Sequence, residues 1–135
     1  LQEINKILLP AQLQVGYRTR DEVALFVLHA LEILEFFRDN QGNQVDSLDL
    51  ALQMKILPRI IGGSETISRV ILGLLGWSSE GAPFIHDEEG QGILSQWIDD
   101  GRPSTIGGSQ FPRLAARLCL MWERLRVEGY TSYWL

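Results

Sequence analysis

The sequence of 135 residues is poor in cysteine, in histidine and in long apolar runs. Its one cysteine, Cys119, cannot form a disulfide within the chain. The position of this residue in an apolar helical pattern predicts a buried, reduced thiol, and we therefore expect a cytoplasmic location. No apolar run approaches the roughly 18 residues that cross a bilayer, so we expect no association with a membrane.

The residue patterns of a self-contained active site are also missing. The glycine pairs at 62–63 and 107–108 are followed by serine without lysine, which excludes a Walker phosphate loop. His29 and His86 are too few and too distant for a zinc site, and the acidic run at 86–90 lacks the ligand spacing of a calcium loop. We expect no metal site and no catalytic residue in this chain alone.

Basic residues are outnumbered, since 12 lysines and arginines face 17 acidic residues and give a formal charge of −5. This balance argues against a general nucleic-acid binder but allows a local basic patch. The C-terminal arginines form such a patch, with Glu123 as the counter-charge among them. It is interpreted as a solvated helix face, a partner surface or a nucleic-acid surface, and its members are Arg102, Arg113, Arg117, Arg124 and Arg126.

What the sequence does contain is helical periodicity across most of its length. An apolar content of 45% and this length suit a single domain over residues 1–135. The apolar spacing predicts helices up to Leu9, over 19–39, from Asp46 or Ser47 to 57, over 65–77 and over 112–128. No segment alternates with a period of two. We therefore predict an all-α fold, a compact bundle of five or six helices.

Several residues mark where these helices begin and end. Thr19 and Glu22 form a capping box, Ser64 suits an N-cap, Pro112 suits a first helical position and Gly129 suits a C-terminal cap. In contrast, residues 78–110 are rich in glycine, serine, aspartate and proline. They predict a long irregular excursion, with a short helix or irregular strand near 92–99.

The first helix predicts that the chain is a fragment. Leu1, Ile4 and Leu8 share one helical face from the first residue onward, and no capping residue precedes them. We expect a helix cut from a longer protein, although a trimmed start is the alternative.

Arg18 and Arg20 flank Thr19 at the start of the predicted helix over 19–39. Positive charge opposes the helix macrodipole at this end, and surface arginines are one interpretation. The alternative is a phosphate contact, because free backbone N–H groups and two guanidinium groups suit an oxyanion.

Three stretches resemble the C-terminal part of the NTPase subunit of McrBC-type, methylcytosine-dependent restriction systems, a branch of the AAA+ motor proteins. They are INKILLP followed by VGYRTRDEV, then DLALQMKILPRIIGGSE, then FPRLAARLCLMWERLRVEGYTSYW. Their order and spacing match, whereas residues 78–108 have no counterpart.

The resemblance implies a C-terminal helical lid domain that contributes a sensor-2-like arginine, with Arg18 the first candidate and Arg20 the second. It also implies an upstream AAA+ core that binds ATP or GTP with Mg²⁺, and neighbouring subunits in a ring oligomer. A nuclease subunit and DNA are further implied partners. The alternative hypothesis is a stand-alone protein- or DNA-interaction module that uses the arginine-bearing final helix.

Overall fold

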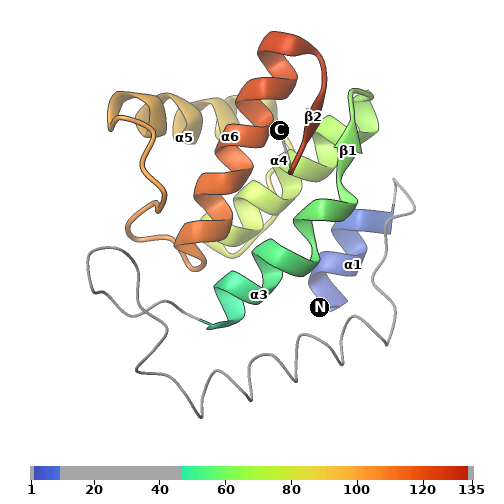
Figure 1. Cartoon of the computed structure of the whole chain (residues 1–135), viewed down its shortest axis with the longest axis horizontal. Coiled ribbons are helices and arrows are strands. Elements are labelled where there is room, and N and C mark those ends of the chain that lie inside the picture. Colours follow the sequence, from blue (N-terminus) through green and yellow to red (C-terminus); the bar gives the residue numbers. More distant parts are fainter. Residues whose placement is uncertain (1, 10–46, 134–135) are drawn as a thin grey trace.

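The computed structural model describes residues 2–9 and 47–133 (Figure 1). Within these ranges the predicted all-α fold is confirmed. No described helix is long and apolar enough to cross a membrane. The helices are α1 (Gln2–Leu8), α3 (Ser47–Lys55), α4 (Glu65–Glu80), α5 (Asp87–Asp99) and α6 (Pro112–Glu128), with a 3₁₀ turn (Leu57–Arg59) and short strands β1 (Ile61–Gly62) and β2 (Thr131–Ser132). The predicted helix over 19–39 and its capping box lie outside the described residues.

Among the described helices, α4 and α6 lie at the centre and share the most extensive contact (Figure 1). Helix α1 packs on α4, α3 packs on α6, and α5 packs on both central helices. The apolar spacing of the last helix predicts a buried stripe, and the structure confirms it: Leu114, Leu118, Met121, Trp122 and Leu125 are all buried. Burial of these large side chains is the main source of stability in a fold of this size.

The predicted capping positions within the described residues are confirmed, whereas two predicted helix ends are wrong: α3 ends at Lys55 rather than at 57, and α4 continues past 77 to Glu80. Ser64 caps α4 because its hydroxyl oxygen accepts a hydrogen bond from the Ile67 N–H at 3.2 Å. Pro112 occupies the first turn of α6, where its missing N–H costs nothing. Gly129 ends α6 with a φ of 76°, a left-handed conformation that glycine adopts without strain.

The segment 78–110 is more helical than its composition suggests, because α5 occupies thirteen of its residues. The helix begins where the Glu89 carboxylate accepts a hydrogen bond from the His86 N–H at 3.1 Å. Gly90 obscures the helical pattern, since glycine is a poor helix former. Here it is required by packing: a Cβ at Gly90 would overlap the Leu72 side chain and lie 2.9 Å from the Trp122 ring.

The two strands are absent from the sequence-based prediction for a simple reason. Strands β1 and β2 are two residues long and pair antiparallel, so no alternation of apolar residues can develop. Their pairing brings Gly63 against the end of α6, where a Cβ at Gly63 would overlap the Gly129 carbonyl oxygen. The segment after α3 is thereby joined to the segment after α6.

The two glycines of α5 test the packing argument as a matched pair. We expect Gly90→Ala to lower the free energy of unfolding by about 1–3 kcal/mol, because the added methyl overpacks the core. Gly92 has open space around its Cβ position, so Gly92→Ala should raise the free energy of unfolding by about 0.5–1 kcal/mol. Urea denaturation of both variants measures the difference, and equal shifts would contradict the close approach at Gly90.

Candidate functional site on the last helix

The position of α6 is set by a buried carboxylate on another helix. Asp49 of α3 is 2% exposed, and its two oxygens accept hydrogen bonds from the N–H groups of Arg113 and Leu114 at 2.8 and 2.9 Å. These are the second and third residues of α6, the groups that an N-cap side chain normally satisfies. A negative charge here also complements the positive end of the helix dipole.

Asp49 was not predicted as a key residue, but the sequence carries a signal for it. Phe111, at the N-cap of α6, has no side-chain acceptor, and Pro112 has no N–H. The first turn of α6 therefore needs an acceptor from a distant segment. Asp49, 64 positions before Arg113 in the sequence, provides this acceptor. Patterns among neighbouring residues do not reveal a pairing over that distance.

Arg113 and Arg117 were both predicted as surface residues. They lie in the first half of α6, after this cap, and both are half-buried. The Arg117 guanidinium lies 4.7 Å from the centroid of the Tyr133 ring and donates a hydrogen bond to the Tyr133 carbonyl oxygen. This pair of contacts fixes Arg117 in place and ties the chain after β2 back to the first half of α6.

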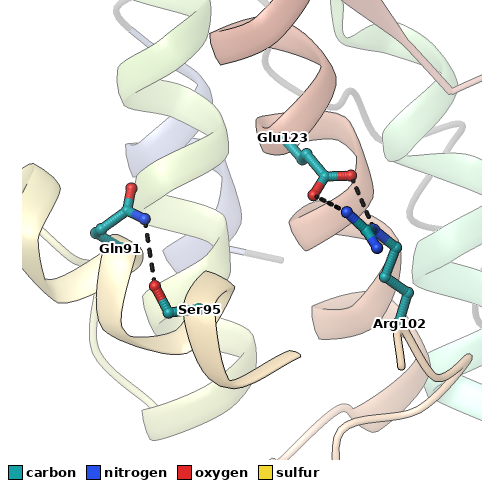
Figure 2. A network of polar contacts seen from close by, with 4 residues as sticks. All are labelled: Gln91, Ser95, Arg102 and Glu123. Carbon is teal, nitrogen blue, oxygen red and sulfur yellow. Dashed lines mark hydrogen bonds and ion pairs between the residues drawn. The ribbon is translucent and has the colours of Figure 1, made fainter. Parts of the chain in front are cut away.

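Arg102 reaches the same helix from the segment that follows α5. Figure 2 shows its guanidinium facing Glu123 of α6, with two hydrogen bonds of 3.2 and 3.1 Å. The Arg102 backbone has a φ of 54°, an uncommon conformation for a residue other than glycine. Trp97 holds it there, because its carbonyl accepts from the Arg102 N–H at 2.9 Å and its indole N–H donates to the Pro103 carbonyl at 2.8 Å.

Arg124 and Arg126, the other two predicted arginines, lie farther along α6 than Arg113 and Arg117. Arg124 is half-buried about two turns beyond Arg117, and its Nη1 atom is buried without a hydrogen-bond partner in the part of the chain that the structure describes. Arg126 lies about two and a half turns beyond Arg117, on the opposite side of α6. Its guanidinium covers the Trp122 ring at 4.9 Å from the centroid. Arg113, Arg117 and Arg124 therefore lie on one side of α6, whereas Arg126 lies on the opposite side.

The arginines that do converge line a groove of about 270 Å³, which we call the arginine groove. Its walls come from α3, from α5 with the segment after it, and from the first half of α6. The residues that line it are Gln53, Trp97, Arg102, Pro103, Ser104, Arg113, Ala116, Arg117 and Leu120.

A second cavity of about 490 Å³ lies between α1 and α4. Its lining is mostly apolar, including Ile7, Val70 and Phe84. Glu3 is its acidic residue, and it accepts a hydrogen bond from the Trp77 indole at 2.8 Å. Lys6 and Arg69 also line the cavity, so its charged residues are of both signs.

The remaining predicted site residues concern phosphate and metal. Arg18 and Arg20, the candidates for a phosphate contact, lie outside the described residues. Residues 2–9 and 47–133 contain no group of three or more histidine, cysteine, aspartate or glutamate side chains arranged to hold a metal ion. Of the predicted site residues, Arg102, Arg113 and Arg117 are the ones that line a common groove.

The predicted burial of Cys119 is confirmed, since its side chain is fully buried in α6. Burial raises the pKa of the thiol from 9.0 to about 12, and the charge of Glu123 adds to the rise. The thiolate is the reactive form of cysteine. Cys119 is therefore chemically inert in the folded chain and packs as a small apolar residue.

This inertness can be measured with a thiol reagent at pH 8. With a pKa near 12, only about one thiol in ten thousand is ionised at this pH. We expect the folded chain to react only as fast as it unfolds, and the chain in urea to react within seconds to minutes. Because Cys119 is the one cysteine, the absorbance change reports it alone. Equal rates with and without urea would contradict the buried position.

Comparison with known proteins identifies a family whose model matches this chain. A family model described as a domain of unknown function (DUF8727) matches residues 1–130. No curated protein and no solved structure matches the chain.

Proposed function

We propose that this chain, which belongs to the domain family of unknown function whose model matches residues 1–130, serves as the helical lid of an AAA+ NTPase of the McrBC type. The resemblance of three sequence stretches to the C-terminal part of those motor subunits is the basis of this proposal. The chain would have no catalytic activity alone. It would close over ATP or GTP held with Mg²⁺ by an upstream core.

One observation supports the proposal most directly: the second and third of these stretches form a single structural unit. Asp49, the first residue of the second stretch, caps α6 in the third. At the other end of the same stretches, Ile61 and Gly62 pair with Ser132 and Thr131. Motifs that pack against one another form a common frame, so their joint occurrence is more informative than separate short matches.

The first stretch contributes to the same frame through α1. Ile4 and Leu8 of this helix are buried in the hydrophobic core, and Glu3 bonds to Trp77 of α4. By the resemblance, the chain beyond α1 would place Arg18 near the β- and γ-phosphates, with Arg20 as the second candidate. An arginine in that position stabilises the charge that develops on a transferring phosphoryl group.

The partners of such a lid follow from the same proposal. It would contact the AAA+ core of its own polypeptide and a neighbouring subunit in a ring, and pass the nucleotide state between them. A nuclease subunit and DNA would then be partners of the assembled motor, and the cytoplasm its location.

The test is Arg18→Ala in the protein that joins this chain to an NTPase core. We expect NTP turnover to fall by about a hundredfold or more, because the phosphate charge loses a fixed guanidinium. Arg69→Ala is the matched control, since Arg69 is an exposed residue of α4 that pairs with Glu65 at 3.3 Å. Unchanged turnover and unchanged nucleotide affinity in Arg18→Ala would overturn the assignment.

A further inference from the structure

The cavity of about 490 Å³ between α1 and α4, which we call the α1–α4 cavity, has the size of a small-molecule site. Such sites commonly measure about 300–1,000 Å³ and are lined mostly by apolar side chains with a few polar groups. Helix α1 and the segment 81–84 form two of its walls. A stripe of α4 about 16 Å long forms the third and consists of Thr66, Arg69, Val70, Gly73 and Trp77.

Helix α1 runs antiparallel to α4 along this cavity. Near the end of α4, the Trp77 indole N–H donates a hydrogen bond to Glu3. One turn earlier in α4, a Cβ at Gly73 would lie 3.0 Å from the Ile7 side chain. Gly73 therefore lets the two helices approach closely, and it lines the cavity without a side chain to fill it.

The two ends of the cavity differ in chemistry. Trp77, Pro83 and Phe84 line the end near the C-terminus of α4, and the Trp77 and Phe84 side chains are buried. Toward the start of α4 the cavity is lined by Arg69, about 12 Å before Trp77 along the helix. Lys6 lines the same cavity from α1. An apolar end is therefore joined to a more basic one.

Lys6 supplies an available positive charge at this cavity. Its ammonium group is exposed and makes no ion pair with a carboxylate of residues 2–9 or 47–133. The other two charged groups of the lining are engaged, because Arg69 pairs with Glu65 at 3.3 Å and Glu3 accepts the Trp77 indole N–H at 2.8 Å. The arrangement therefore favours an anionic head group on a ligand whose body is apolar.

We propose that the α1–α4 cavity binds a small, medium-chain aliphatic monocarboxylate. Its hydrocarbon chain would pack on Trp77, Pro83 and Phe84, and its carboxylate would pair with Lys6. A cavity bounded by two helices and a connecting segment suits a molecule that enters it whole, whereas protein partners commonly meet a broad and flatter surface. The site consists of described residues and does not depend on the assignment of the chain as an AAA+ lid.

Trp77 makes occupancy of this site measurable. Its ring lines the cavity and also stacks on Phe111, with the ring centroids 5.0 Å apart. Its indole N–H is fixed by Glu3, so it has one defined environment in the empty cavity. A hydrocarbon chain against the ring would change that environment and shift the indole N–H signal in an NMR spectrum.

The experiment titrates the whole chain with decanoate at pH 7, below the concentration at which decanoate forms micelles. Isothermal titration calorimetry measures the affinity, and NMR follows the Trp77 indole N–H. We expect saturable binding at a single site that shifts this signal. Hexanoate should bind at least about tenfold more weakly, because four fewer methylene groups are buried. Decylamine, which has the same chain length and the opposite charge, should also bind more weakly than decanoate.

Two variants test the cavity, each with a matched control. Thr66→Trp places an indole at the exposed start of the cavity and should weaken decanoate binding by at least about tenfold. Gln91→Trp adds the same group to an exposed position of α5, outside the cavity, and should leave the affinity within about twofold. Lys6→Glu should weaken decanoate binding about tenfold and strengthen decylamine binding. Arg126→Glu reverses the same charge in the last turn of α6 and should change neither affinity.

A thermal melt checks that each variant folds, and if Lys6→Glu does not fold, Thr66→Trp decides. No saturable binding of decanoate, or equal effects of Thr66→Trp and Gln91→Trp, would overturn the proposal. Tighter binding of decylamine than of decanoate would overturn it in favour of an amine that pairs with Glu3. Dimerisation of the chain that Thr66→Trp abolishes, without decanoate binding, would overturn it in favour of a second copy.

Discussion

The bond between the Asp49 carboxylate and the first turn of α6 is the constraint on which the rest of the structure depends. A buried charge is costly unless hydrogen bonds replace its hydration, and two backbone N–H groups do so here at 2.8 and 2.9 Å. The arrangement is reciprocal, since α6 begins with Phe111 and Pro112 and has no local capping acceptor. Each partner satisfies a group that would otherwise be buried alone, so α3 and α6 must be placed together.

Helix α6 is held to α3 and to the segment after α3 at both of its ends. At the start of α6, Asp49 holds α3 in place; at its end, the close approach of Gly63 to Gly129 and the pairing of β1 with β2 hold the chain that follows α3. The same arrangement creates the arginine groove, because α3 contributes Gln53 beside Arg113 and Arg117 of α6. The three stretches behind the proposed lid function and the arginine groove therefore share one frame.

Much of this frame could be predicted from the sequence, and the exceptions have physical causes. Several capping positions and the buried face of α6 were predicted correctly from local signals, because each signal depends on neighbouring residues. These signals are Ser64, Pro112, Gly129 and the apolar stripe of α6. The role of Asp49 depends on a partner 64 positions away, and the length of α5 was obscured by Gly90, whose packing is non-local. The arginines were identified, but which of them converge is decided by the turn of α6 and by the Trp97 contacts.

The most direct test of the central claim is native-state hydrogen exchange at the Arg113 and Leu114 amides, followed by NMR. The Asp49 cap predicts that both amides exchange only when the whole domain unfolds, as slowly as the Leu118 amide in the middle of α6. The exposed first turn of α5, at Glu88, is the internal reference for rapid exchange. In Asp49→Ala the domain should lose about 2–4 kcal/mol of unfolding free energy, since two buried donors lose their acceptor. Exchange of Arg113 and Leu114 as rapid as that of Glu88 in the unaltered chain would contradict the account.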